Sequence, residues 1–228
     1  MTPSRTLAVT LLAPLLLAAC SDGDAAEELS PEERMAAAKT ALDETSGVHV
    51  VLATDDLPAG VNGLLAADGI GTHAPAFEGD IQVSAGGLTA KAAVIAVDGT
   101  VWAVLPFTTD YAEIDPADYT APDPAQLMST DGGLSSLLTS VEDLDAGKDV
   151  RDGKEVLSTF SGTLPGDVVA GVIPSAQADA DFDATFTLDD GNQLSRVVMT
   201  GPFYPKADAV TYTIDFDQYG TDKDIKAP

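Results

Sequence analysis

The first periodic segment of the chain has the spacing of an amphipathic helix. Residues 30–33, S-P-E-E, form a capping-box pattern with proline at the first helical position. Gly47 can end the helix. The apolar positions between them lie three and four residues apart, which places them on one helix face: Met35, Ala38 and Leu42. The pattern predicts one helix over about residues 31 to 45.

After Gly47 the period changes to two, which is typical of strands. Asp-Gly pairs at 98–99, 152–153 and 190–191 indicate tight hairpin turns. Adjacent strands joined by tight turns predict a mostly antiparallel sheet. About ten strands are expected, over residues 48–54, 64–71, 77–84, 88–97, 100–105, 141–150, 155–163, 181–188, 193–200 and 209–217.

Two other regions interrupt the strands. Residues 111–140 begin with three prolines and continue as an apolar stretch, from Ala125 to Leu138, that Gly132 and Gly133 break. This stretch predicts two short helices. A further short helix is expected at residues 167–172, between two prolines.

The strand over residues 90–97 and the one after it are apolar on both faces. Such strands in an antiparallel sheet need cover on both sides. One face could lie against the helices, while the other could line a cavity or a partner surface. Ordinary two-layer packing around a core explains the pattern equally well.

The start of the chain has the features of a secretory signal peptide. Arg5 is the only charged residue among the first nineteen, and the apolar run Leu7–Leu17 is too short to span a bilayer. Leu17-Ala18-Ala19-Cys20 resembles a bacterial lipobox, which implies cleavage before Cys20 and a diacylglyceryl thioether on its sulfur. The alternative is an ordinary signal peptide with a chance cysteine. Two acyl chains are sufficient for stable membrane anchoring.

The expected organisation therefore has four parts. Residues 1–19 are the signal peptide, and residues 20–29 are the lipidated cysteine with an acidic tether. Residues 30–220 form a single domain, and residues 221–228 are a C-terminal tail.

Charge excludes several function classes. The 228 residues include 11 Lys and Arg against 37 Asp and Glu, giving a formal net charge of −26. This charge repels phosphate backbones and anionic headgroups, which excludes nucleic acid as a partner and docking on membranes through a basic patch. A single cysteine excludes an internal disulfide framework and a cysteine-rich zinc site.

Candidate metal ligands have simpler explanations. Asp179, Asp181 and Asp183 would lie on one strand face about 7 Å apart, because a strand rises about 3.3 Å per residue. One calcium ion does not easily bridge them, so a solvated acidic face is the preferred interpretation. His49 and His73 have no neighbouring ligands at metal-binding spacing. No metal site and no cofactor are expected.

Catalysis is not expected either. The chain contains no G-x-S-x-G elbow, no Ser-x-x-Lys pair, no phosphate loop and no dinucleotide fingerprint. A glycosidase carboxylate pair is conceivable, but a pair is expected by chance among 37 acidic residues.

Several short segments, taken in order, resemble the LppX/LprG family of actinobacterial, mycobacterial-type cell-envelope lipoproteins. The matching segments are Cys20 with its lipobox, LPAGVNGLLAADG at 57–69, IDPADY at 114–119, PDPA at 122–125, GLSSLL at 133–138 and GTLPG at 162–166. The resemblance implies an α+β fold. A strongly curved, mostly antiparallel half-barrel would carry helices on its concave face and enclose an apolar cavity.

The resemblance also implies a function. The protein would be a non-enzymatic, membrane-anchored lipoprotein at the extracytoplasmic face of the plasma membrane. It would bind multi-acyl lipids or glycolipids in the cavity and carry them across the envelope, with a membrane lipid exporter as a further partner. The alternative is a noncatalytic envelope scaffold or interaction module with a filled core. Expected cavity-lining residues are Leu64, Leu65, Ile95, Val97, Trp102 and Val104.

Overall fold

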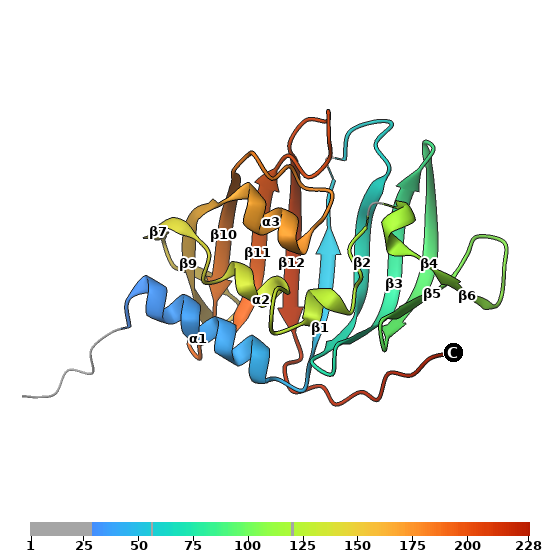
Figure 1. Cartoon of the computed structure of the whole chain (residues 1–228). Helices are drawn as coiled ribbons and strands as arrows, with labels where there is room; N and C mark the ends of the chain where they lie inside the picture. Colours follow the sequence, from blue (N-terminus) through green and yellow to red (C-terminus); the bar gives the residue numbers. More distant parts are fainter. Residues whose placement is uncertain (1–28, 56, 120) are drawn as a thin grey trace, which may run out of the picture.

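A computed structural model gives the structure of residues 29–55, 57–119 and 121–228. Within them, twelve strands form one open antiparallel sheet (Figure 1). Its strand order is β6-β5-β4-β3-β2-β1-β12-β11-β10-β9-β7, and β8 pairs with β9 outside this path. The strands are β1 (Gly47–Ala53), β2 (Gly63–Thr72), β3 (Ala76–Ala85), β4 (Leu88–Val97), β5 (Thr100–Val104), β6 (Tyr111–Ile114), β7 (Glu142–Ala146), β8 (Val150–Asp152), β9 (Glu155–Leu164), β10 (Phe182–Leu188), β11 (Leu194–Gly201) and β12 (Val210–Asp217).

The predicted first helix is confirmed as α1 (Pro31–Glu44). The Ser30 side chain accepts a hydrogen bond from the Glu33 backbone, and the Glu33 carboxylate accepts one from the Ser30 backbone. These two bonds satisfy amides that would otherwise lack partners at the helix start. The predicted face, Met35, Ala38 and Leu42, is buried.

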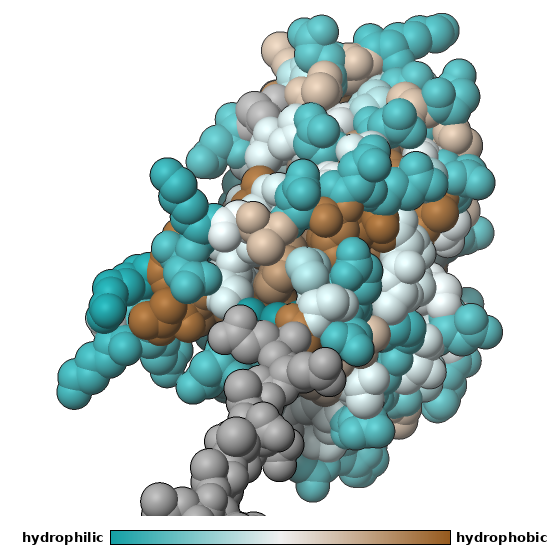
Figure 2. Space-filling view, turned by 90° about the vertical axis from the view of Figure 1, so that its left-hand side faces the viewer, coloured by the Kyte–Doolittle hydropathy of each residue, from teal (hydrophilic) through white to brown (hydrophobic). Residues whose placement is uncertain are grey.

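The other helices are short. They are η1 (Pro116–Tyr119), η2 (Gln126–Met128), α2 (Leu134–Leu137) and α3 (Gly166–Val172). The two short helices expected within residues 125–138 correspond to η2 and α2, separated by the predicted glycine break. Figure 1 shows α1, α2 and α3 on one side of the sheet, over the half that contains β9 to β12. We call this side of the curved sheet the concave face and the other side the convex face. Figure 2 views the molecule from the left-hand side of Figure 1 and shows a surface of mainly hydrophilic residues with hydrophobic residues between them.

The main core fills the space between the concave face and these helices. Apolar side chains of α1, α2 and α3 pack there against alternate residues of β1 and β9 to β12. Phe182, Ala184, Phe186 and Leu188 are all buried, as the alternation in that strand predicts.

The structure corrects two parts of the sequence-based expectation. The expected strand over residues 141–150 is divided into β7 and β8, with a register shift between Glu142 and Asp145 and a positive φ of 49° at Asp143. In addition, β6 was not expected as a strand. It pairs with β5, where Tyr111 lies opposite Val104.

The last residues of the chain pack on the convex face. Ile225 is buried together with Ala76, Ile95 and Val97. The Lys223 ammonium lies 3.1 Å from a carboxylate oxygen of Glu78. Both faces of the doubly apolar strand β4 are therefore covered in its second half, one of them by the C-terminal segment.

Candidate functional site

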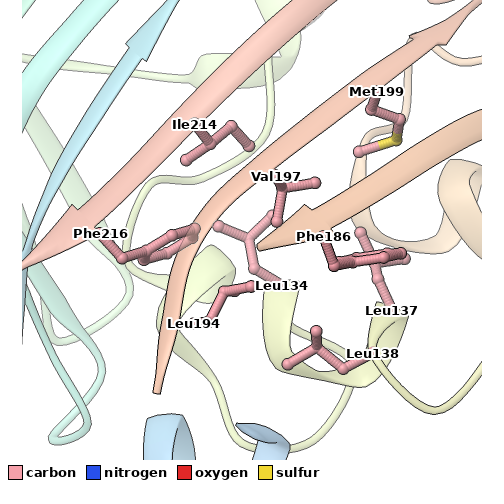
Figure 3. Close-up of a pocket in the computed structure, with 9 residues that line it drawn as sticks. All are labelled: Leu134, Leu137, Leu138, Phe186, Leu194, Val197, Met199, Ile214 and Phe216. Atoms are coloured by element: carbon pink, nitrogen blue, oxygen red, sulfur yellow. The ribbon is translucent and has the colours of Figure 1, made fainter. Parts of the chain in front are cut away.

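A closed apolar pocket lies between α2 and the strands β10, β11 and β12 (Figure 3). The space inside it admits the centre of a water-sized sphere over only about 10 Å³, which is room for about one water molecule. All nine residues that line it are apolar: Leu134, Leu137, Leu138, Phe186, Leu194, Val197, Met199, Ile214 and Phe216.

Three leucines of the α2 segment close the pocket from the helix side. Figure 3 shows them across from the aromatic and aliphatic side chains of the sheet. A lysine on α1 holds the segment that leads into α2: the Lys39 ammonium donates to the Thr130 carbonyl at 3.3 Å and to the Ser135 hydroxyl at 3.4 Å. It also pairs with Asp43 at 2.5 Å. Lys39 therefore links α1 to the cover of the pocket.

The concave face continues beyond the helices as an apolar row across four strands. Leu52, Ala67, Ile81 and Ala92 are register partners across β1, β2, β3 and β4. Leu52 packs against the main core, which places this row on the concave face. All four side chains are only half-buried. We call these four residues the open row.

Two glycines lie next to the open row in the sheet. Gly69 and Gly79 are register partners in β2 and β3. A Cβ atom on Gly69 would lie 2.6 Å from the ring of Phe77 and 2.8 Å from the Gly79 Cα atom. Because neither glycine has a side chain, the Phe77 ring can occupy the space beside them.

A tyrosine pair contacts the backbone of Leu64 near the start of β2. The Tyr212 hydroxyl donates to the Leu64 carbonyl at 2.7 Å, and the Leu64 amide donates to the Tyr204 hydroxyl at 3.3 Å. The two hydroxyls lie 2.7 Å apart. Tyr212 is buried in the main core, so Tyr204 connects the surface to the apolar interior at this point.

Of the expected cavity-lining residues, Leu64 lies on the concave face, opposite Val83 of β3. Leu65 is the extra residue of a β-bulge between Leu64 and Ala66. No partner in β3 fixes the direction of its side chain.

The other four expected residues lie on the convex face. Ile95 and Val97 are buried against Ile225, and Trp102 packs on the same cluster. Val104 follows Trp102 by two residues and shares its face. None of the six expected residues is among those that line the closed pocket, and a contact of any of them with a ligand stays a prediction. Cys20 lies outside the described residues.

The titratable residues form no metal site in the described part of the chain, where no group of three or more His, Cys, Asp or Glu could hold a metal ion. His49 instead lies between two carboxylates on the convex face, 2.8 Å from Asp68 and 2.7 Å from Asp217. The hydrogen bond to Asp68 raises the pKa of His49 above its ordinary value, partial burial opposes this, and Asp217 raises it further. The His73 ring donates to the Met128 carbonyl at 2.6 Å, which ties the β2–β3 turn to η2.

The sequence analysis missed the residues of α2 as pocket residues. Their signal was present, since Leu134, Leu137 and Leu138 have helical spacing, but it did not show which strands they contact. None of the described helices has both the length and the apolar content that a membrane span requires.

Comparisons with known proteins found a matching family, related sequences and solved structures with the same fold. The family model of the LppX_LprAFG lipoproteins matches residues 30–227. The lipoarabinomannan carrier protein LprG of Mycobacterium tuberculosis (strain H37Rv) is 25% identical over 190 residues, which cover 81% of this chain and 78% of LprG.

Two solved structures share the fold. LprF from Mycobacterium bovis superimposes with a TM-score of 0.70 at 17% identity, covering 87% of this chain and 96% of that one. LppX from Mycobacterium tuberculosis gives a TM-score of 0.63 at 16% identity, covering 86% and 98%.

Proposed function

The chain belongs to the LppX_LprAFG lipoprotein family, and from this premise we propose that it is a lipid carrier of the cell envelope. It would bind the acyl chains of a multi-acyl lipid or glycolipid between the concave face and the helices. The carrier role named for LprG supports this proposal, as does the shared fold. No catalytic step is assigned to it.

The open row is the observation that carries the proposal. Its four side chains are apolar, yet they lie half-exposed on the face that the helices cover elsewhere. Three of the four strands also contribute alanine or glycine at neighbouring positions on this face. A half-exposed apolar surface that continues a buried core is suited to acyl chains.

Loading of the closed pocket requires movement of α2, because the space there holds about one water molecule. The free energy of moving acyl chains from a bilayer into the protein does not strongly oppose loading. Burial gives about 0.8 kcal/mol per CH₂ relative to water, but the acyl chains come from a bilayer that is equally apolar. The net free energy of transfer from the bilayer to the protein is then near zero, which suits reversible loading and release.

We further propose that Cys20 carries the lipid anchor and holds the protein at the extracytoplasmic face of the plasma membrane. A membrane lipid exporter would be the donor or acceptor of the lipid. The lipobox pattern at residues 17–20 supports the anchor.

A matched pair of tryptophan substitutions tests the binding face. Ala67 belongs to the open row, whereas the neighbouring Ala66 pairs with Gln82 and points to the convex face. Ala67→Trp would occupy ligand space, so we expect lipid loading to fall while Ala66→Trp leaves it unchanged. Native mass spectrometry of each folded variant after incubation with phosphatidylglycerol vesicles measures the bound lipid. Equal loading of both variants would contradict the assignment.

One observation favours the alternative of an envelope scaffold with a filled core. The pocket under α2 is almost completely filled by its own side chains. A scaffold would keep this packing in the presence of lipid vesicles, and neither tryptophan variant would then differ from the unaltered protein in bound lipid.

A further inference from the structure

The two edges of the sheet differ in how far they are protected. β7 forms one edge, where it lies beside α1 and has a register shift between Glu142 and Asp145. β6 forms the other edge, at the right-hand end of the sheet in Figure 1. Its four residues pair with β5 in unbroken register. A bulge, a proline or a lysine commonly prevents an edge strand from pairing with another chain, and β6 contains none of these.

The outer side of β6 presents backbone groups that no strand of the described chain pairs with. In an antiparallel pair, alternate residues direct their amide and carbonyl groups to the neighbouring strand, and the residues between them direct theirs away from it. An edge of this kind can accept an extended segment of another protein as an additional strand, held by main-chain hydrogen bonds.

The two faces of β6 determine which side chains an added strand would carry. Ile114 packs against a buried apolar cluster that includes Val94. Val94 shares the face of Ala92, a residue of the open row, so this cluster lies on the concave face. Alternation along β6 then places Tyr111 and Glu113 on the convex face. An added strand would therefore have apolar side chains on its concave side, and partners for a tyrosine ring and a carboxylate on the other.

The charge around β6 favours a basic partner. Residues 92–147 contain no Lys or Arg. Four exposed acidic residues lie in or near β6, and none of them forms an ion pair with another described residue: Asp110, Glu113, Asp115 and Asp118. Lysine or arginine side chains on an added strand would lie near the Glu113 carboxylate and beside the ring of Tyr111, which can also bind a cation.

Exposed aromatic side chains gather at the same edge. Among the described residues, the exposed aromatic ones all lie within residues 107–119: Phe107, Tyr111 and Tyr119. Phe107 is completely exposed and has a φ of 69°, a left-handed conformation that is unusual for a bulky residue. Aromatic residues are enriched among those that contribute most of the binding energy of protein interfaces. Their position beside a free backbone edge supports a protein partner.

We propose that β6 is a docking site for an extended, basic segment of a partner protein, which adds to the sheet as one more strand. A second copy of this chain does not suit the site. Pairing of β6 with the β6 of another copy would bring the acidic residues of both edges together, and each chain has a formal net charge of −26. Like charges on adjacent strands are destabilising. The proposal does not depend on the lipid-carrier function.

A short capped peptide that alternates lysine and valine is the probe. The protein is residues 20–228 with Cys20→Ser, which contains every described element. Amide NMR shifts measure binding residue by residue at physiological salt, where the Debye length is about 8 Å. We expect shifts and slower amide exchange concentrated in β6. The same peptide methylated on every backbone nitrogen keeps its charges but donates no backbone hydrogen bond, so it should not bind. Equal binding of the methylated peptide would overturn the proposal, because charge alone would then explain the attraction.

Glu113→Lys and Glu142→Lys are a matched pair, since both make the same change of charge at an exposed glutamate of an edge strand. We expect Glu113→Lys to weaken peptide binding about fivefold by replacing cross-strand attraction with repulsion, and Glu142→Lys to leave binding unchanged. Equal weakening in both variants, or no shifts in β6 of the unaltered protein, would overturn the site. In the latter case, co-sedimentation with phosphatidylcholine vesicles that Phe107→Ser abolishes would assign the exposed aromatic residues to a membrane instead.

Discussion

The Nδ1 atom of His49 lies 2.7 Å from a carboxylate oxygen of Asp217, directly across the β1–β12 pairing. The other ring nitrogen contacts Asp68 of β2 at 2.8 Å. One imidazole thus bridges three strands at the junction between the two halves of the sheet. With both nitrogens facing carboxylates, the protonated ring is the form that both contacts stabilise.

This arrangement predicts a pH-dependent contribution to stability. The pKa of His49 in the folded protein is raised from 6.5, chiefly by Asp68. The contribution is therefore complete below pH 6.5 and is lost as pH rises through the raised folded value. We expect the difference in unfolding free energy between the unaltered protein and His49→Gln to be largest near pH 5.5 and to shrink above neutrality. A difference that grows with pH, measured by urea denaturation, would contradict this.

A second prediction concerns the convex cluster. Val97 is buried with Ala76, Ile95 and Ile225, so Val97→Trp would overpack this site or displace the C-terminal segment. We expect a loss of about 1–3 kcal/mol in unfolding free energy, with lipid loading per folded molecule unchanged. The control is Val156→Trp, at an exposed position of β9, which should stay within about 0.5 kcal/mol. Reduced loading without loss of stability would instead place Val97 at the ligand.

The third prediction concerns the cover of the closed pocket. Lys39→Met removes the contacts from α1 to Thr130 and Ser135, so the α2 segment should open more often. If the closed arrangement of α2 loses about 1 kcal/mol of stability relative to the open one, the open population rises about fivefold. We expect faster amide exchange in α2 and lipid loading that is faster by a similar factor.

The exposed Lys148 provides the control for this prediction, as Lys148→Met. If exchange in α2 rises in Lys39→Met while the loading rate matches that of Lys148→Met, then α2 is not the segment through which lipid enters.

The fourth prediction concerns the anchor. Thioether formation requires a thiol, so Cys20→Ser should abolish acylation of the chain. Metabolic labelling with a palmitate analogue measures this directly. Label that persists in the serine variant would show that acylation occurs elsewhere, because Cys20 is the chain's single cysteine.

Local signals in the sequence predicted much of the fold. The capping box at Ser30 and Glu33 located α1, and the Asp98-Gly99 pair located a two-residue hairpin in which both residues have positive φ. Those features depend on neighbouring residues alone. The strand β6 gave no such signal, because Tyr111, Ala112 and Glu113 are all exposed and show no alternation of burial.

The site could be predicted only in part, because it depends on contacts between distant segments. The buried faces of β10 and β12 followed from alternation, but their contact with Leu137 and Leu138 depends on where α2 lies. Ile225 is a single apolar residue in a polar segment, so nothing local indicated that it covers Ile95 and Val97. Contact of Ile95 and Val97 with a ligand, which the sequence analysis expected, stays a prediction.

Native mass spectrometry of the Cys20→Ser chain, without added detergent, tests the lipid-carrier account most directly. The protein is examined as purified, then after removal of lipid and incubation with phosphatidylglycerol vesicles. We expect a mass increase that matches a multi-acyl lipid in at least one of the two samples, together with slower amide exchange at Ala67 and Ile81 in the loaded protein. A mass equal to that of the polypeptide alone in both samples would contradict the account.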